Sequence, residues 1–372
     1  MHTKEKSLLH LVKRLQSTGW QSWSTKTIEK ALFKLPTFNY SPIDINPTKF
    51  NDISIPKSLK NPVTGWCSWY AYGWDINETK ILDQAKWMSK NKQLLLKYVL
   101  IDGGWCMWGD WLDEDNRRFP DGLKRTVKKI NSLGLSAGIW IAPFLVHPRS
   151  NIAKYNPSWL VKKDGRLVDG LKITPWNLPL KFKRWILDIK NPEVQEYLFK
   201  SIEYLVHECG FELLKLDFLY GIYFDPNFEA KEADEYLQRF LIKIKEKYPQ
   251  IYTIGCGCPL VPAIGKVDSM RIGPDSIISP FLKFNSLARI IDRYLYGYTL
   301  KTLRNRIWTK GFWNVDLDSF VCRKWSGLSE NQTLEHLAII KKAGGNIFLG
   351  DDLTKLSEKR INKYIIPLFT NE

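Results

Sequence analysis

The sequence has few cysteines, and their spacing would hold neither a metal ion nor a disulfide framework. Its six cysteines are scattered over 372 residues, at positions 67, 106, 209, 256, 258 and 322, and form no CxxC pair. This pattern excludes a zinc module and a disulfide-stapled scaffold, and reduced thiols are typical of the cytoplasm. The sequence also has no HExxH, P-loop or GxGxxG motif, so we expect no metal and no cofactor.

Long apolar runs are missing too. The longest uncharged stretch, GLSAGIWIAPFLV at 134–146, is too short to cross a bilayer, and its glycines and proline favour a buried strand. The first residues, HTKEKSLLH after Met1, lack the apolar core of a secretion signal. We therefore expect a cytoplasmic protein with no membrane partner.

The basic charge is large but has no dense block. A net charge of +16 is compatible with nucleic acid or acidic surfaces as partners. The 55 lysines and arginines, however, are mixed with 39 acids along the whole chain, which is typical of a solvated lysine-rich surface. We expect no nucleic-acid partner; the competing hypothesis predicts salt-sensitive retention on DNA.

Eight short apolar runs, each ending in polar or glycine-rich residues, indicate β-strands. They lie at 63–69, 97–105, 136–144, 213–218, 252–258, 269–275, 312–316 and 346–352. Helical patterns separate most of them, at 78–92, 121–133, 192–209, 229–248, 282–306 and 329–343. This alternation predicts an α/β protein of the (β/α)8 TIM-barrel class, with its active site at the C-terminal ends of the strands.

Residues 1–60 differ from the rest. The segment SLLHLVKRLQ has the spacing of an amphipathic helix, GWQSWS follows it, and five prolines punctuate residues 36–62. We expect an N-terminal extension at 1–60 and a catalytic barrel at 61–372.

Carboxylates follow several of the predicted strands. In FELLKLDFLY (211–220), Lys215 and Asp217 are two positions apart and so share one face of a strand. Burying an unpaired charge is costly, so the two neutralise each other or serve a site. The other acids at strand ends are Asp102, Asp275, Asp316, Asp351 and Asp352.

Acids at strand ends without cofactor motifs suggest glycoside hydrolysis, which needs one ionised and one protonated carboxyl group. Lys215 favours the ionised form of Asp217. Burial and the charge of Asp217 favour a protonated Asp275, whereas Arg271, four residues earlier, opposes it. A purely structural pair of Arg271 and Asp275 is the alternative. The 16 tryptophans and 16 tyrosines serve either as core or as faces for sugar rings.

A series of motifs carries a resemblance over about residues 63–357. They are, in order, GWCSWYAYGWD, LIDGGW followed by GDW, GIWIAPFLVHPRS, HPRSNIAKYNPSW, KLDFLY, GCGCPLVPAIGKVDSMRIGPD, FWNVD and FLGDDLTKLS. In this order the chain resembles family 36 of the glycoside hydrolases, the α-galactosidase-type retaining enzymes. The resemblance implies an enzyme with a (β/α)8 catalytic barrel that hydrolyses terminal α-galactosyl linkages of oligosaccharides by double displacement.

The resemblance also implies roles for individual residues. Asp217 in KLDF corresponds to the nucleophile and Asp275 in RIGPD to the acid/base, and their carboxyl groups should lie about 5 to 5.5 Å apart. The residues implied to bind the sugar are Asp102, Trp140, Lys215, Cys256, Arg271 and, from the GWQSWS motif, Trp23.

Two departures from the family pattern stand out. The family normally has two aspartates in IDDxW, which accept hydrogen bonds from the 4- and 6-hydroxyls of galactose, but here Gly103 replaces the second. A lost charged acceptor costs about 1.5 to 3 kcal/mol, which leaves the sugar open. Larger members place a β-sandwich before the barrel and a β domain after it. Without these we expect a more open site, with Trp23 acting in cis or from a neighbouring subunit.

Three alternatives to an α-galactosidase stay open at this point. The first is an α-galactosyl transferase of the raffinose-synthase type, which reuses the same nucleophile. The second is an α-glycosidase with another sugar specificity, and the third is a carbohydrate-binding protein that has lost turnover. The expected partner is a small carbohydrate, and a homo-oligomer is left open.

Overall fold

Eight parallel strands follow one another around a ring at the centre of the structure. The computed structural model describes residues 59–171, 183–277, 286–324 and 326–370. From β1 to β11 each strand of the ring pairs with the next, and β1 also pairs with β12. The isolated bridges Asp316–Asn346 and Phe320–Leu349 join the last two strands and nearly close the ring. The strands are β1 (Thr64–Cys67), β2 (Tyr98–Ile101), β3 (Ser136–Ile141), β8 (Leu213–Leu216), β9 (Tyr252–Gly255), β10 (Ser269–Arg271), β11 (Asn314–Asp316) and β12 (Ile347–Leu349).

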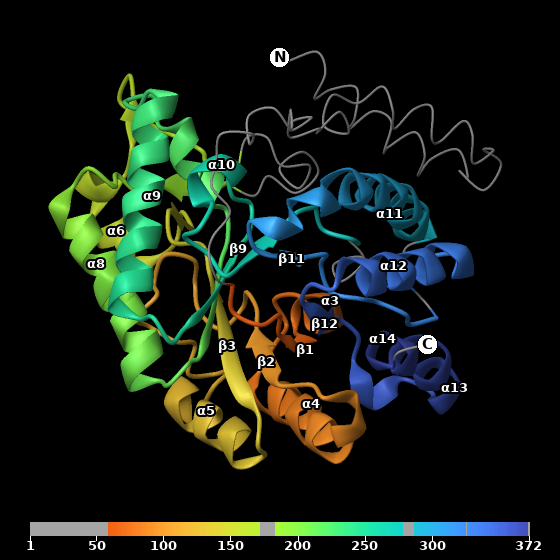
Figure 1. The fold of residues 1–372 in the computed structure, drawn as a ribbon. Helices are drawn as coiled ribbons and strands as arrows, with labels where there is room; N and C mark the ends of the chain where they lie inside the picture. The colour runs from red at the N-terminus through yellow and green to blue at the C-terminus, as the bar shows by residue number, and fades with distance from the viewer. Residues whose placement is uncertain (1–58, 172–182, 278–285, 325, 371–372) are drawn as a thin grey trace.

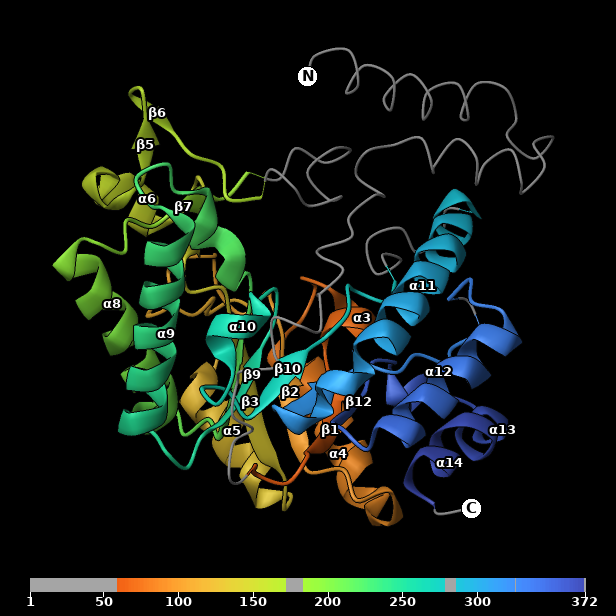
Figure 2. The ribbon, with the colours of Figure 1, turned by 45° about the horizontal axis from the view of Figure 1, so that its top comes forward.

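Helices surround this ring. Figures 1 and 2 show α8 and α9 on one side of the strands, α11 and α12 on the other, and α4 and α5 beneath them. The four-residue α10 occupies the short β9–β10 connection, where the sequence left no room for a normal helix. The fold is a (β/α)8 barrel, and each predicted strand segment contains one of its strands. The helices are α3 (Trp69–Tyr72), α4 (Glu78–Lys90), α5 (Gly122–Ser132), α8 (Pro192–Glu203), α9 (Ala230–Lys247), α10 (Leu260–Ala263), α11 (Ser286–Arg306), α12 (Glu330–Ala343), α13 (Glu358–Arg360) and α14 (Ile366–Phe369).

Local sequence explains where several helices begin. Asn191 caps α8 by accepting the backbone N–H of Glu193, and Pro192 occupies the first helical position, where its missing N–H costs nothing. At α12, Ser329 and Gln332 form a capping box. These caps satisfy backbone donors that have no partner within the helix, so each of the two helices starts at a defined residue.

Between β3 and α8 the chain makes an excursion, from Leu145 to Ile186, that was not predicted as structured but contains several short elements. They are β4 (Leu145–Val146) paired with β7 (Trp185–Ile186), β5 (Lys162–Lys163) paired with β6 (Arg166–Leu167), and α6 (Asn151–Tyr155). Strands of two residues are too short to show the alternation that indicates a strand in sequence. This excursion lies on the same side of the barrel as α8 and α9 (Figure 2).

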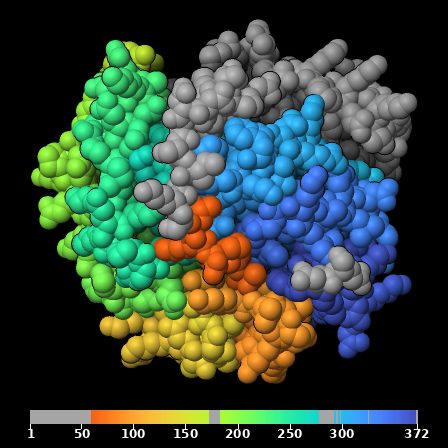
Figure 3. All heavy atoms as spheres, viewed as in Figure 1, coloured from red at the N-terminus to blue at the C-terminus, as the bar shows by residue number. Residues whose placement is uncertain are grey.

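The segment before β1 covers the N-terminal ends of the strands. Lys60 Nζ donates to the carbonyl of Ile251 at 2.6 Å, and its own carbonyl accepts from Asn314 Nδ2 at 2.7 Å. The backbone N–H of Val63 donates to Asn346 Oδ1 at 3.0 Å. In Figure 3 this red-orange segment lies at the centre of the face, between the green and blue helices. Polar groups at this end therefore stabilise the barrel, and the opposite end remains for a site.

The predicted extension at 1–60, with Trp23, lies almost wholly outside the described residues, so the proposed domain boundary stays a prediction. Within the ranges that the structure describes, no helix is long and apolar enough to cross a membrane.

Candidate active site

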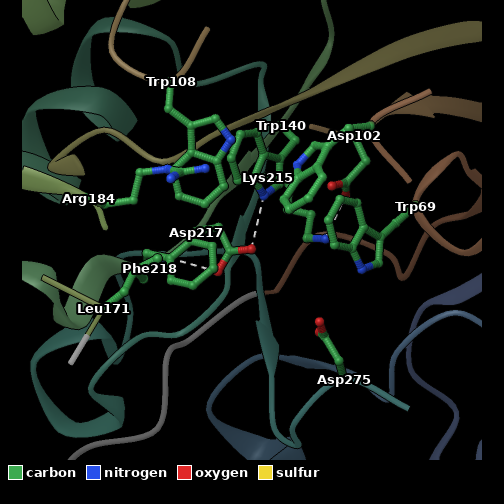
Figure 4. Close-up of a pocket in the computed structure, with 11 residues that line it drawn as sticks. Trp69, Asp102, Trp108, Trp140, Leu171, Arg184, Lys215, Asp217, Phe218 and Asp275 are labelled. Carbon is green, nitrogen blue, oxygen red and sulfur yellow. Dashed lines mark hydrogen bonds and ion pairs between the residues drawn. The ribbon is translucent and has the colours of Figure 1, made fainter. Parts of the chain in front are cut away.

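At the C-terminal ends of the strands the barrel opens into a cavity of about 600 Å³, counting its open mouth. Charged side chains and aromatic rings meet there from β3, β8 and the connections that follow β1, β2, β3, β8 and β10 (Figure 4). The cavity thus lies at the end of the barrel that the fold class predicts for an active site. Its lining residues are Trp69, Trp74, Asp102, Trp108, Trp140, Leu171, Arg184, Lys215, Asp217, Phe218 and Asp275.

Lys215 and Asp217 both line this cavity, as their spacing predicted, but the ion pair of Lys215 is with Asp102. The Lys215 Nζ lies 2.7 Å from Asp102 Oδ2, and the two side chains are 6% and 3% exposed. Asp102 also accepts from the backbone N–H of Gly103 at 2.8 Å and from the Cys67 thiol at 3.4 Å. Burial lowers the pKa of Lys215, but the Asp102 carboxylate outweighs it and holds that pKa well above its usual range. The lysine is therefore a fixed cation beside the cavity.

Asp217 directly follows β8 and is held by two N–H donors. Trp140 Nε1 donates to Oδ2 at 2.9 Å, and the backbone N–H of Phe218 donates to Oδ1 at 2.6 Å. Phe218 has a φ of 52°, a left-handed conformation that costs a non-glycine residue about 1 to 2 kcal/mol. Each oxygen of the carboxylate thus has a donor, and hydrogen bonds to an ionised group are the strong ones. The hydrogen-bond donors of Asp217 are thus Trp140 and the backbone of Phe218, while Lys215 forms its ion pair with Asp102.

Asp275 reaches the cavity from the loop after β10, and its carboxyl group points into the space that Asp217 also faces (Figure 4). Its side chain is 33% exposed because one edge opens onto the cavity, while Arg271 Nη1 lies 3.4 Å from Oδ1. Burial and then the nearby Asp318 carboxylate raise the pKa of Asp275 to about 7, although Arg271 and Lys215 act in the opposite direction. A carboxyl group with this pKa retains a proton on a large share of molecules at neutral pH.

Arg271 is buried behind Asp275 and faces three carboxylates. Its Nη2 lies 2.6 Å from Asp318 Oδ1, and its Nε lies 3.4 Å from Asp316 Oδ1. The predicted pair of Arg271 and Asp275 exists, but it is a longer contact than the one with Asp318. Arg271 is not among the residues that line the cavity, so its implied contact with the sugar stays a prediction.

Of the other residues implied to bind the sugar, one lines the cavity and one does not. Trp140 lines the cavity, whereas Cys256 is 5% exposed and is not among the lining residues. Trp23 lies outside the described residues, and the expected separation of 5 to 5.5 Å between the two catalytic carboxyl groups also stays a prediction.

Several lining residues were not predicted as site residues. Trp69 begins the short α3, Trp74 follows its end, and their rings meet edge to face with centroids 5.8 Å apart. Trp108 follows β2, and the guanidinium of Arg184 stacks on its ring, with the Cζ atom 4.3 Å from the ring centroid. The sequence pointed to these tryptophans, because they lie at or a few residues after the ends of predicted strands. No sequence pattern pointed to Arg184, since it comes from the excursion between β3 and β8.

Arg184 brings a second cation to the cavity. Burial lowers the pKa of Arg184 to about 10, and Asp169 acts against this shift. The side chain therefore stays charged at neutral pH.

Comparison with known proteins assigns the chain to a family. The melibiase family model matches residues 57–258, which is just over half of the chain and includes Asp102, Lys215 and Asp217. The chain belongs to the melibiase family. Asp275 lies beyond the matched range, so its assignment rests on the RIGPD motif and on its position in the cavity.

Curated relatives are similar over part of their length. The chain is 26% identical over 209 residues to an α-galactosidase of Pediococcus pentosaceus, covering 51% of this chain and 26% of that protein. It is 22% identical over 200 residues to an α-galactosidase of Escherichia coli, with the same coverage of both chains. The match thus spans about a quarter of the length of these relatives.

Solved structures of melibiase-type enzymes share the fold. The α-galactosidase TtGalA of Thermus thermophilus, in complex with p-nitrophenyl α-D-galactopyranoside, superposes with a TM-score of 0.70 at 25% identity, over 85% of this chain and 63% of that one. The family 36 α-galactosidase AgaA of Geobacillus stearothermophilus gives a TM-score of 0.60 at 19% identity, over 83% of this chain and 41% of that one.

Proposed function

We propose that this melibiase-family protein is a retaining α-glycosidase and that terminal α-galactosides are its first candidate substrates. The observation that carries the proposal is the meeting of two unlike carboxyl groups in one cavity. Asp217 has an N–H donor on each oxygen, and the pKa of Asp275 is raised to about 7. Retaining glycosidases need one ionised and one protonated carboxyl group at the same pH, and the α-galactosidase relatives support the choice of sugar.

The chemistry is a double displacement. The Asp217 carboxylate attacks the anomeric carbon while Asp275 gives its proton to the leaving oxygen, so a glycosyl ester forms as the glycosidic bond breaks. Asp275 then takes a proton from water, and the water attacks the same carbon and releases Asp217. The anomeric centre is inverted twice, and the product keeps the α configuration.

Azide rescue of two matched variants tests both roles. Asp217→Gly should abolish turnover of a 4-nitrophenyl α-glycoside, and azide entering the vacated space should yield the β-glycosyl azide. Asp275→Gly should still form the glycosyl ester with this good leaving group, and azide should then yield the α-glycosyl azide. Identification of the azide anomer by NMR decides the matter. The same anomer from both variants would show that the two residues do not have these separate roles.

The sugar that fits best depends on the surroundings of Gly103. A Cβ atom built there would lie 3.6 Å from Trp140 and 3.7 Å from Trp69, so the space beside Asp102 is bounded by indole rings. We propose that this space relaxes selection for the galactose hydroxyl that a second aspartate would bind.

A panel of 4-nitrophenyl glycosides tests this specificity: α-galactoside, α-N-acetylgalactosaminide, α-glucoside and β-L-arabinopyranoside. If the space relaxes selection, the β-L-arabinopyranoside, which lacks the 6-hydroxyl, is turned over at a rate comparable with the α-galactoside. A strong preference for the galactoside contradicts this role of Gly103. Silence across the whole panel, with folded protein, contradicts hydrolysis of simple glycosides.

Product analysis distinguishes hydrolysis from transfer. With an α-galactoside donor alone, a hydrolase releases free sugar. A transferase of the raffinose-synthase type releases little until an acceptor sugar is added, and it then forms a larger oligosaccharide. A protein that has lost turnover binds sugar with equal affinity before and after Asp217→Gly and forms no product in either assay.

A further inference from the structure

Asp318 is a buried carboxylate in the loop after β11 that the proposed mechanism does not use. It is 3% exposed, does not line the cavity and has a φ of 73°, in the left-handed region. Its Oδ2 accepts from the Tyr70 hydroxyl at 2.5 Å and from the backbone N–H of Ser276 at 2.6 Å. Its Oδ1 accepts from the backbone N–H of Ser319 at 2.6 Å and lies 2.6 Å from Arg271 Nη2.

Two of these partners flank Asp275 in the chain. Arg271 precedes Asp275 by four residues, and Ser276 directly follows it, so one carboxylate holds the loop on both sides of the candidate acid. We infer that Asp318 is a positioning residue for Asp275, which anchors the loop that carries it and draws the Arg271 guanidinium away from its carboxyl group. This inference rests on the proposed function.

The distances support a competition for Arg271. The guanidinium lies 2.6 Å from Asp318 but 3.4 Å from Asp275, so its closest ion pair is with the positioning residue. Burial opposes the charge of Asp318, but Arg271 and the Tyr70 hydroxyl together hold the pKa of Asp318 below its usual range. Asp318 therefore stays ionised at the pH where Asp275 has to keep a proton.

Several charged groups act on the pKa of Asp275, some raising it and some lowering it. Asp318 and Asp217 favour its protonated form, while Arg271 and Lys215 favour its ionised form. Within the described ranges, the titratable side chains that act on it come from β8 and the residue after it, β10, α3 and the loops after β9 and β11: Lys215, Asp217, Arg271, Tyr70, Cys256 and Asp318. Removing the charge of Asp318 deletes a contribution that favours the protonated form of Asp275, and it frees Arg271 to approach Asp275. Both effects lower the pKa of Asp275.

The test is the pH dependence of kcat/KM for Asp318→Asn with a substrate whose leaving group is a sugar. Activity falls as pH rises through the pKa of the acid. In the variant this limb should move to lower pH by about 1 to 3 pH units, the effect of an opposite charge that comes close to a carboxyl group. With an α-glycosyl fluoride, whose leaving group needs no proton, the variant should lose far less activity. A limb that does not move, or an equal loss with the fluoride, would show that Asp318 is only structural.

A second variant keeps the test decisive if the asparagine protein does not fold. Asparagine and glycine both tolerate the left-handed backbone. The amide NH2 of asparagine, however, would face N–H or O–H donors where Asp318 has an accepting oxygen, and this could destabilise the fold. In Asp318→Gly water can replace the carboxylate, and the same shift of the limb is expected. Tyr70→Phe is the matched control, because it removes the hydroxyl that donates to Asp318 and accepts from the backbone N–H of Ser276 at 2.8 Å, and leaves the charge of Asp318 in place. In Tyr70→Phe the fall of kcat/KM with rising pH should occur at the same pH as in the wild type. A shift as large as that of Asp318→Asn would contradict the charge argument.

A direct titration separates this inference from the proposed function. The carboxyl group of Asp275 can be followed by NMR in protein labelled with 13C at aspartate side chains and assigned with Asp275→Asn. Its midpoint should be near 7 in the wild type and lower in Asp318→Asn. This result in a protein without turnover would refute the glycosidase but not the positioning role, while equal midpoints in an active enzyme would refute the positioning role alone.

Discussion

Replacing Lys215 by methionine should lower the free energy of unfolding by about 3 to 5 kcal/mol, the cost of breaking a buried ion pair from one side. The Lys215 Nζ lies 2.7 Å from Asp102 Oδ2, and both side chains are at most 6% exposed. Without the lysine, Asp102 keeps the donors from Gly103 and Cys67, both weaker partners than a cation, for a charge shielded from water. Equilibrium unfolding in urea, followed by tryptophan fluorescence, measures the loss.

An exposed pair of the same length provides the control. Lys80 Nζ also lies 2.7 Å from a carboxylate oxygen, that of Asp75, but these side chains are 31% and 81% exposed. Lys80→Met should cost no more than about 1 kcal/mol, because water screens an exposed pair. The Lys215→Met/Asp102→Asn double variant should be less destabilised than the sum of the singles by about 0.5 to 3 kcal/mol. Equal losses for Lys215→Met and Lys80→Met would refute the claim that burial decides the strength of the pair.

Three further predictions concern the candidate acid, sugar selection and stability. In the wild type, kcat/KM for a substrate with a sugar leaving group should fall as pH rises through about 7. The reason is that the pKa of Asp275 is raised to about 7 and only its protonated form can give a proton to the leaving group. A kcat/KM that does not change up to pH 9 would contradict this. Gly103→Asp should raise kcat/KM for the α-galactoside relative to the β-L-arabinopyranoside by about one to two decades, the effect of one charged hydrogen bond, and Gly103→Ala should not. Ser329→Ala should lower the free energy of unfolding in urea by about 1 kcal/mol, since it removes the capping box of α12, and an unchanged midpoint would contradict that role.

Part of the site was predictable from the sequence because it depends on short spacings. Strand residues two apart share a face, so Lys215 and Asp217 had to point the same way, and both line the cavity. The partner of Lys215 was not predictable from spacing. Asp102 lies 113 residues away in the chain, and the two come together only because β2 and β8 pair with opposite edges of β3.

The order of the eight barrel strands and of the main helices, the barrel class and the end of the barrel where acids gather were all predictable from the sequence. These follow from periodicity and from residues close together in the chain, whose geometry is local. The packed barrel was needed to show which charges pair, that Asp318 lies closer to Arg271 than Asp275 does, and that Arg184 enters the cavity from the excursion between β3 and β8. Ion pairing and desolvation depend on distances through space, and these distances are set when segments far apart in the chain pack together.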